Sequence, residues 1–192
     1  MSQPSMRDRM IACAAQVVAR RGVPGTSFAE VLLLTGASRG SIYHHFPGGK
    51  QELIEAALDW FADQLENALN ELRASTPAAM LEQLVLLWRN KLLSNDCEAG
   101  CAIAAAVLSN AGMQLDEVNR LAFARLHAAV VRAMKRSGMA APEEFVMLFL
   151  STVQGAIVLC RAEMQIDPYD IAMAQLQRLF ALDSASAATA TR

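Results

Sequence analysis

Apolar residues recur at helical spacing along almost the whole chain of 192 residues, and no segment alternates at the period of a β-strand. The clearest case is residues 50–73, where apolar side chains line one face and acidic side chains line the other. Hydrophobic residues make up 54% of the chain and charged residues 19%, which argues against disorder. We therefore predict an all-α fold with a sizeable buried core.

Glycine, proline and short polar runs divide this helical pattern into about nine segments. Gly22, Gly36 and the run Pro47-Gly48-Gly49 end the first three. The helices predicted in this way cover residues 10–22, 27–36, 39–45, 50–73, 78–94, 99–109, 115–137, 142–165 and 168–182. Residues 183–192 have no large apolar side chain, and we predict a flexible tail there. Three short helices would thus precede a helical bundle.

Charge is distributed unevenly along the chain. Residues 1–50 carry six Lys/Arg and two acidic residues, a net charge of +4, whereas residues 51–192 carry eleven and seventeen, a net charge of −6. A basic segment joined to an acidic one suggests a polyanion-binding domain attached to a module with another task. We expect a first domain of residues 1–50 that runs into the connecting helix 50–73, and a second domain of residues 51–182.

The ends of the chain and its cysteines indicate the cellular compartment. The N-terminal segment lacks the apolar core of a signal peptide. The uncharged and strongly apolar run of residues 145–160 is sixteen residues long, whereas a bilayer span needs about 20 apolar residues. Four cysteines in a chain of this length do not make a disulfide scaffold. These features predict a cytoplasmic protein with reduced thiols and no membrane contact.

Residues 26–46 are the most informative segment. They predict a helix, a tight turn at Gly36 and a second short helix capped by Ser38, which is helix-turn-helix geometry. In such motifs the second helix enters the major groove of DNA. Its exposed face would carry the polar side chains of Arg39, Ser41, Tyr43 and His44.

Apolar and glycine positions of the same short helix have their own expected roles. Ile42 and Phe46 are four residues apart, and we expect them to anchor the helix to its domain. Gly40 destabilises a helix interior, so its presence suggests a geometric reason, such as a close approach to the DNA backbone.

The run Gly-Ala-Ser-Arg-Gly-Ser-Ile-Tyr-His-His-Phe at 36–46, followed by Pro-Gly-Gly-Lys at 47–50 and Glu-Leu at 52–53, resembles the tetracycline-repressor (TetR/AcrR) family. The Pro-Gly-Gly-Lys run and Ala-Gly-Cys at 99–101 resemble its LmrA/YxaF-like branch. The resemblance implies a homodimeric transcriptional repressor that leaves a palindromic DNA operator when its C-terminal bundle binds a small-molecule effector. It implies no cofactor and no metal. Residues 31–34 are more apolar than this family's usual second helix.

The resemblance also assigns roles within the motif. Thr26, Ser38, Tyr43, His44 and Lys50 would contact phosphates, and Arg39 would reach base edges together with Ser41 and Tyr43. The chemistry agrees, because hydroxyl groups bind phosphate and arginine can bond guanine in two places. Adjacent helical residues point about 100° apart, so we expect His44 rather than His45 to face DNA. Two alternatives are open: the Tyr43 ring could pack against the first helix, and Arg39 could be a solvated charge.

The last two long helices are suited to dimerisation, which the resemblance implies for the C-terminal domain. The expected interface residues are apolar or small and recur at helical spacing: Phe145, Phe149, Thr152, Val153, Ala156, Ile171, Ala174, Leu179 and Phe180. The alternative is that about half of these residues face the core of their own subunit.

A pocket for an apolar or aromatic effector would combine apolar bulk with a few polar groups. The candidate residues are Trp60, Met80, Trp88, Cys101, Met113, Phe123, His127, Met147 and Gln154. Each is also a candidate for ordinary core packing.

Cys97 and Cys101 suggest a further possibility, because a spacing of four could place both thiols on one helical face. They could form a redox switch or, less readily, a metal site, whereas the simplest alternative is structural. A redox-sensing regulator with the same DNA-binding head is therefore an alternative function. A small helical enzyme is another, but we find no cluster of nucleophile, acid and base, and we predict no catalytic residue.

Overall fold

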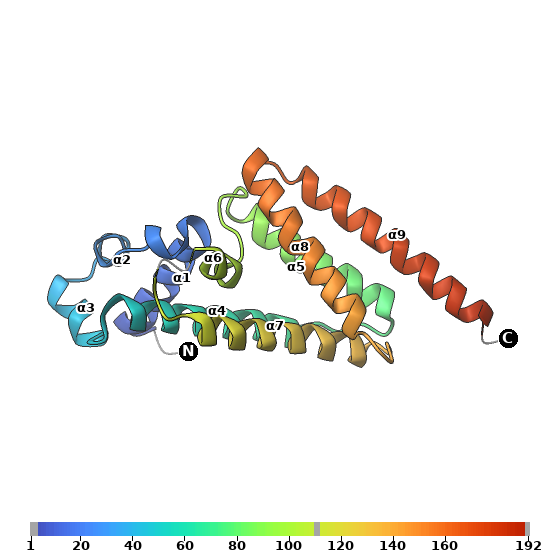
Figure 1. The fold of residues 1–192 in the computed structure, drawn as a ribbon, viewed down its shortest axis with the longest axis horizontal. Helices are drawn as coiled ribbons and strands as arrows, with labels where there is room; N and C mark the ends of the chain where they lie inside the picture. Colours follow the sequence, from blue (N-terminus) through green and yellow to red (C-terminus); the bar gives the residue numbers. More distant parts are fainter. Residues whose placement is uncertain (1–3, 110–111, 191–192) are drawn as a thin grey trace. The chain divides into compact units, whose positions relative to one another are not determined.

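The computed structural model describes residues 4–109 and 112–190, and in these ranges it contains nine α-helices and no β-strand (Figure 1). The helices are α1 (Met6–Gly25), α2 (Phe28–Thr35), α3 (Arg39–His45), α4 (Gly49–Glu71), α5 (Pro77–Leu93), α6 (Ala102–Leu108), α7 (Asp116–Arg136), α8 (Glu143–Glu163) and α9 (Asp167–Ala190). The predicted all-α fold is confirmed, and the order of the helices is the expected one.

Side-chain caps fix the starts of several helices. The Ser27 hydroxyl at α2 and the Ser38 hydroxyl at α3 each accept a hydrogen bond from the backbone N–H three residues further on. Thr76 caps α5 in the same way, and Pro77 begins that helix. Each cap satisfies a backbone donor that the first helical turn leaves without an intrahelical partner.

The last helix is longer than predicted. α9 includes residues 183–190, which we expected to belong to a flexible tail. These eight residues include four alanines and neither glycine nor proline, and alanine has the highest intrinsic helix propensity. Residues 191 and 192, the remainder of the expected tail, lie outside the described residues.

The helices form two compact units. The first unit comprises Met1–Glu66 and Ala99–Leu126, and the second comprises Asn67–Glu98 and His127–Arg192. α4 and α7 therefore each contribute to both units. This division differs from the boundary at residue 50 that charge suggested, because α6 packs against α1 and joins the first unit.

A kink in α1 is held by α6. Gly22 leaves helical geometry, with φ 70° and ψ −179°, before the chain completes a final turn to Gly25. On the N-terminal side of the kink, Gly100 N–H donates to the Ala19 carbonyl oxygen at 3.0 Å. On the C-terminal side, Val23 N–H donates to the Ser109 hydroxyl at 3.0 Å. We call these two hydrogen bonds the α1–α6 clasp.

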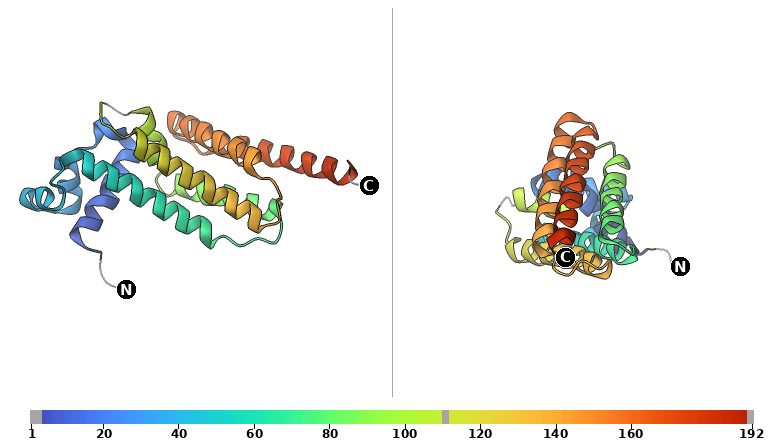
Figure 2. Two further views of the ribbon diagram at one scale, coloured as in Figure 1. Left: turned by 60° about the horizontal axis from the view of Figure 1, so that its bottom comes forward. Right: turned by 90° about the vertical axis from the view of Figure 1, so that its right-hand side faces the viewer.

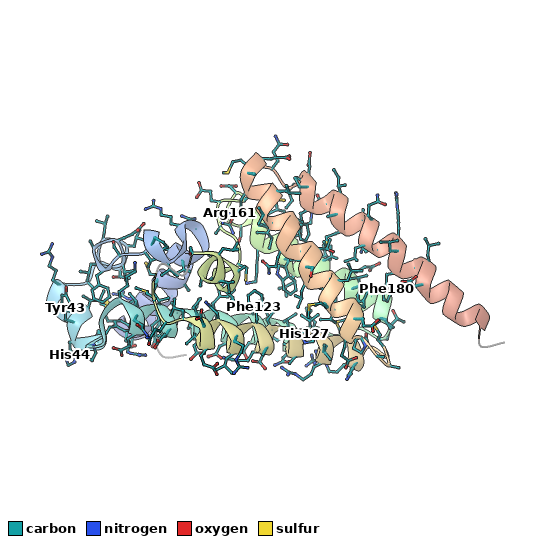
Figure 3. All side chains as sticks on the ribbon, in the orientation of Figure 1. Tyr43, His44, Phe123, His127, Arg161 and Phe180 are labelled. Carbon is teal, nitrogen blue, oxygen red and sulfur yellow. The ribbon has the colours of Figure 1, made fainter. Side chains whose placement is uncertain are left out.

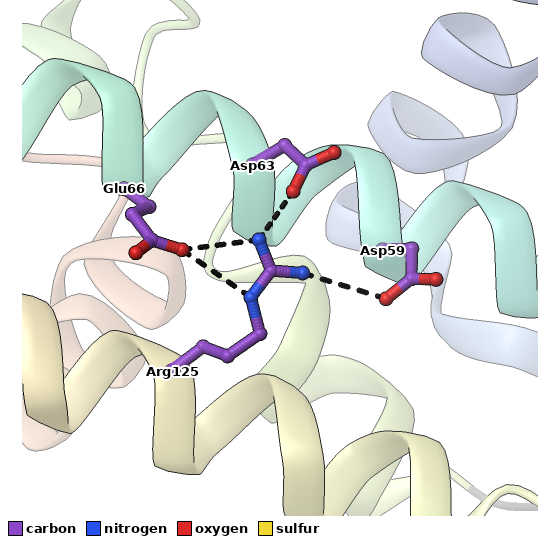
Figure 4. Close-up of polar contacts among 4 residues, drawn as sticks. All are labelled: Asp59, Asp63, Glu66 and Arg125. Carbon is purple, nitrogen blue, oxygen red and sulfur yellow. Dashed lines mark hydrogen bonds and ion pairs between the residues drawn. The ribbon is translucent and has the colours of Figure 1, made fainter.

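Within the first unit, an arginine joins α4 to α7. The Arg125 guanidinium on α7 lies among three carboxylates of α4, those of Asp59, Asp63 and Glu66 (Figure 4). Its Nη2 atom is 3.0 Å from Glu66 Oε2 and also contacts Asp63. The hydrogen bond to Asp63, with that to Glu66, raises the pKa of Arg125. The cluster neutralises acidic charge that would otherwise repel along this face of α4.

In the second unit, α8 and α9 lie side by side, and α5 packs against α9 (Figures 1 and 2). The ring of Trp88 on α5 meets the ring of Phe149 on α8 edge to face, with centroids 5.6 Å apart. The buried Tyr169 hydroxyl donates to the Val85 carbonyl oxygen at 2.9 Å, and burial raises the pKa of this phenol. These contacts connect the three helices through apolar packing and a satisfied buried polar group.

α8 is long and apolar enough to span a bilayer by length and composition alone. In the structure 39% of its most apolar window is buried, and the buried side includes Val146, Phe149, Val153 and Ile157. These residues recur every three or four positions, which is the pattern of a helix that packs in a bundle.

Candidate nucleic-acid interface

α2, α3 and the turn between them form a helix-turn-helix. Gly36 ends α2 in the left-handed conformation, with φ 69° and ψ 18°. A residue with a Cβ atom is disfavoured there, so glycine is the residue that this tight turn requires. Ser38 then caps α3, as predicted, and the motif has the arrangement expected from the sequence.

The inner side of the motif is anchored in an apolar cluster. Ile42 and Phe46 are fully buried, as predicted, and Val31 of α2 is buried with them. They pack with Met10 of α1 and Leu53 of α4. The orientation of α3 is therefore fixed by side chains on its inner face, which leaves the opposite face to solvent.

The outer face of α3 carries polar and aromatic side chains. Arg39 and His44 are exposed, whereas His45 is half-buried, which agrees with the choice of His44 over His45. Tyr43 is 64% exposed, and its ring contacts the ring of Phe28 on α2 edge to face, with centroids 5.5 Å apart. Tyr43 thus packs against α2 rather than the first helix, and it keeps most of its surface accessible (Figure 3).

Nothing within the first unit explains why position 40 is a glycine. A Cβ atom added there would have no neighbour within 4 Å, and the backbone is not in the left-handed region. The glycine therefore costs helix stability without relieving any contact in the described part of the chain. This is the pattern expected where an external surface approaches the backbone closely.

The residues expected to contact DNA from the ends of the motif differ in how far their side chains are buried. Thr26 is fully buried, and its hydroxyl donates to the Gly22 carbonyl oxygen at 2.9 Å. The prediction that Thr26 contacts phosphate is wrong for this conformation, because its side chain closes the kink of α1 instead. Ser27, one residue later, is exposed at the start of α2. Lys50 is half-buried in the first turn of α4, and Ser41 is half-buried on α3.

The basic residues around the motif differ in what they contact. Arg21 pairs with Glu30 at 2.7 Å, and the Arg7 guanidinium lies over the Phe46 ring, 5.2 Å from its centroid. Arg39 has no ion pair among the described residues. Its charge is therefore not neutralised by a nearby carboxylate and is available to an external anion.

The candidate pocket residues fall in both units. Trp60, Cys101, Met113 and Phe123 belong to the first unit, and Met80, Trp88, His127, Met147 and Gln154 belong to the second. Trp60 packs against the core of the helix-turn-helix domain, and Met147 is exposed on α8. For these two residues the structure contradicts a role as pocket lining, because their surroundings are another core and solvent.

A buried asparagine that the sequence did not single out lines a cavity in the first unit. Asn119 of α7 is 5% exposed, and its Oδ1 atom has no hydrogen-bond partner. It borders a cavity of about 270 Å³ together with Phe123 and Val107. The only sequence signal was an amide at a buried position of an amphipathic helix. In the second unit, Gln154 Nε2 is likewise buried without a partner.

Three of the expected dimer-interface residues are core residues. Phe149, Val153 and Ala156 are buried in their own unit, so the structure contradicts their assignment to an interface. Thr152, Phe145 and Phe180 are half-buried, and the last two rings lie 4.7 Å apart. Ile171, Ala174 and Leu179 are exposed on α9.

Between residues 147 and 162, about four turns, the solvent-facing side of α8 exposes no charged side chain. Its exposed residues are Met147, Leu148, Ser151, Gly155, Val158, Leu159 and Ala162, and the exposed charged residues of α8, Glu143, Glu144 and Glu163, lie at the two ends of the helix. An exposed helix face of this size without charge is unusual for a monomer surface. We call it the α8 face.

The cysteines are arranged differently from the sequence expectation. Cys97 lies in the loop after α5, with a left-handed φ of 60°, and α6 begins only at Ala102. Cys97 and Cys101 therefore do not share a helical face. Cys101 packs in an apolar cluster of the first unit, whereas Cys97 contacts Cys160 in the second. No group of three potential metal ligands occurs among the described residues.

Known proteins resemble this chain over both parts. Residues 10–57 match the model of bacterial regulatory proteins of the tetR family, and residues 77–175 match the C-terminal domain of LmrA/YxaF-like transcriptional regulators. An uncharacterized HTH-type transcriptional regulator of Mycobacterium tuberculosis is 34% identical over 186 residues, which cover 90% of this chain and 93% of the relative.

Solved structures share the fold. A TetR transcriptional regulator from Legionella pneumophila superposes with a TM-score of 0.80 at 16% identity, over 93% of this chain and 99% of that chain. A TetR-family regulator from Agrobacterium tumefaciens gives a TM-score of 0.76 at 20% identity, over 90% and 96%. The helix-turn-helix, the family models and the relative agree, and the chain belongs to the TetR family of DNA-binding transcriptional regulators.

Proposed function

We propose that this regulator is a cytoplasmic, homodimeric repressor that binds a palindromic operator in double-stranded DNA and is released by a small apolar or aromatic ligand. The observation that most supports this function is the outer face of α3. It exposes Arg39, Tyr43 and His44, while Ile42 and Phe46 fix the helix from the inside. A second copy would place an identical α3 in the next half-site.

Each exposed group has a role that suits its chemistry. Arg39, at the first position of α3, would donate two hydrogen bonds to the O6 and N7 atoms of guanine. Phosphate contacts or the positioning of the helix would fall to Ser38, Ser41, Tyr43, His44 and Lys50. Ser41 and Tyr43 lie on the same helix as Arg39 and would also reach base edges. Ser27, exposed at the start of α2, takes the phosphate-binding role expected of Thr26.

The α8 face supports the dimer. Its lack of charge suits contact with an identical helix, and Gly155 lies in its middle with no neighbour within 4 Å of the position a Cβ atom would take. Ile171, Ala174 and Leu179 of α9 would extend the same contact. Two helices from each subunit would form a four-helix interface.

The cavity beside Asn119 supports a role for a ligand. Phe123 and Val107 offer apolar walls, Asp116 and Arg120 add charged groups, and the unpartnered Oδ1 of Asn119 offers a hydrogen-bond acceptor. A small apolar molecule with one N–H or O–H donor would satisfy that acceptor. Such a ligand would release the repressor by favouring a conformation in which the two heads do not fit both half-sites.

Replacement of Arg39 by alanine tests the DNA-reading role of α3. Loss of a guanine contact costs about 1–3 kcal/mol, so we expect affinity for a selected operator to fall roughly tenfold to a hundredfold per half-site. Non-specific affinity should change little, because it depends on phosphate contacts. Operators would be selected from a random duplex library with the wild-type protein, and binding measured by fluorescence anisotropy at fixed salt. Arg178→Ala removes an exposed arginine of α9 and is the matched control. Equal operator affinity of all three proteins would contradict the proposal.

Replacement of Gly40 by alanine should separate folding from DNA binding. Alanine at an open helical position is expected to raise the free energy of unfolding by about 0.5–1 kcal/mol. The same methyl group would lie between α3 and the DNA backbone and should weaken operator binding at least tenfold. Urea unfolding and anisotropy on one preparation measure both effects. Unchanged operator affinity would show that the backbone of α3 does not approach DNA at this position.

A further inference from the structure

Cys97 and Cys160 lie together in the second unit, although 62 residues separate them in the sequence. Cys97 is 3% exposed and Cys160 is fully buried. The side chains of Cys97 and Cys160 interact with each other, which places the two sulfur atoms close together. Both cysteines are reduced in this structure.

The backbone fixes both thiols at the ends of helices. Cys97 N–H donates to the Leu92 carbonyl oxygen at 3.0 Å, which holds the loop against the last turn of α5. Cys160 lies in the last turn of α8, where its carbonyl oxygen accepts from Gln165 N–H at 3.2 Å. Its Sγ atom is 3.7 Å from the Ile166 carbonyl oxygen. The pair is therefore held by main-chain contacts of two separate elements.

A cavity gives small molecules access to Cys97. It has a volume of about 420 Å³ and is lined by Cys97 and Glu98 of the loop and by Val158, Arg161, Ala162 and Met164 at the end of α8 (Figure 3 labels Arg161). A water molecule takes up about 30 Å³ in the liquid, so the cavity admits a reagent the size of hydrogen peroxide. Because these lining residues border one cavity, the loop of Cys97 lies beside the end of α8, the helix that carries Cys160.

We propose that Cys97 and Cys160 are a redox-active dithiol that a peroxide converts into an intramolecular disulfide between the α5–α6 loop and the end of α8. The Cys97 thiolate attacks one peroxide oxygen, the O–O bond breaks, and the products are a sulfenic acid and hydroxide, which becomes water by taking up the proton that the Cys97 thiol released. The Cys160 thiol then attacks the sulfenic sulfur, the S–S bond forms, and a second water leaves. Two thiols are oxidised, and one peroxide is reduced to two waters. This site goes beyond the proposed repressor function and does not depend on it.

The surroundings set the pH at which the pair reacts. Burial raises the pKa of both thiols, and Asp96 adds to the effect at Cys97. Asp170 and Glu163 face Cys160, and Tyr169 lies beside it. Glu98 and Arg161 line the cavity with opposite charges. Because the thiolate is the nucleophile, the rate of oxidation should rise with pH, by up to roughly tenfold per unit below the thiol pKa.

The test uses the full chain, reduced and then treated with hydrogen peroxide at pH 8.5. We expect the protein to lose two of its four free thiols, to stay unlinked between chains on a non-reducing gel, and to yield a peptide pair joining Cys97 to Cys160 by mass spectrometry. The melting temperature of the oxidised protein should rise by roughly 5 °C and return on reduction, because the disulfide closes a long loop. The measured rate should increase between pH 7 and pH 8.5.

Three variants make the test specific. Cys97→Ala and Cys160→Ala should each abolish the intramolecular disulfide, whereas the matched control Cys101→Ala should retain it. If either of the first two fails to fold, the peptide map of the oxidised wild type decides the question alone. A disulfide between Cys97 and Cys101, crosslinks only between chains, or four free thiols in folded protein after treatment would each overturn the proposal.

Discussion

Replacement of Gly22 by alanine should destabilise the protein by roughly 3 kcal/mol or more. Gly22 has φ 70° and ψ −179°, a conformation that is essentially restricted to glycine and costs other residues about 1–3 kcal/mol. An added Cβ atom would also lie 2.5 Å from Ser109 Oγ and 3.0 Å from Ser109 Cβ. α6 would have to move away from α1, and overpacking of this kind costs about 1–3 kcal/mol more. Urea unfolding followed by circular dichroism measures the loss.

Gly36→Ala is the matched control for Gly22→Ala. Gly36 also has a left-handed φ, of 69°, but an added Cβ atom would meet nothing within 4 Å. The backbone penalty alone should cost about 1–2 kcal/mol. In the Ser109→Gly background, which already lacks the hydrogen bond to Val23, Gly22→Ala should cost less than it does in the wild type, because the clashing atoms are gone. Equal losses at Gly22 and Gly36, or no coupling to Ser109, would show that α6 does not press on the kink.

Replacement of Gly155 by leucine should weaken the proposed dimer by a hundredfold or more. Gly155 is exposed in the middle of the α8 face, and nothing in its own subunit would contact an added Cβ atom. In the proposed dimer, the close approach of a helix from the second copy explains the glycine. A leucine side chain would hold the two helices apart. A hundredfold increase in the dissociation constant of the dimer corresponds to a loss of about 2.7 kcal/mol of association free energy. The subunit itself should become slightly more stable, because leucine is a better helix former than glycine. Sedimentation velocity over a dilution series measures the dissociation constant.

Gly40→Leu provides the comparison for Gly155→Leu. It is the same substitution at a second open helical position, and it should leave the dimer intact while it abolishes operator binding. Gly155→Leu should weaken operator binding only as far as it dissociates the dimer, so raising the protein concentration should restore it. A Gly155→Leu protein that dimerises as tightly as the wild type would place the interface on another surface.

Features that depend on a few neighbouring residues could be predicted from the sequence. The cap at Ser38, the turn at Gly36 and the anchors Ile42 and Phe46 follow from local helix chemistry, and the structure has each of them. The phosphate contact of the Thr26 side chain, which the family resemblance implies, does not fit the structure, because this side chain is buried. Only the structure shows that Ser27 takes the cap and Thr26 turns inward.

Features that depend on distant contacts could not be predicted in this way. Ser109 holds α1 through Val23, 86 residues earlier, and no local pattern indicates that pair. The spacing of Cys97 and Cys101 suggested a shared helical face, but the positive φ of Cys97 places it outside a helix. Its neighbour is Cys160, which lies 63 positions later in the chain, so that no local pattern indicates the pair. The apolar stripe of α8 likewise contained both core and exposed residues, because the helix is apolar on both sides.

The α1–α6 clasp has a consequence for how such a regulator can diversify. The bond from Gly100 to Ala19 joins two main-chain groups, and any residue except proline at position 100 can donate it. The side chains around both helices can therefore change during evolution without breaking that half of the clasp. The half that depends on a side chain, Ser109, needs only a small residue with a hydroxyl group. The kink of α1 can therefore be retained within the first unit while most of the surrounding side chains are replaced.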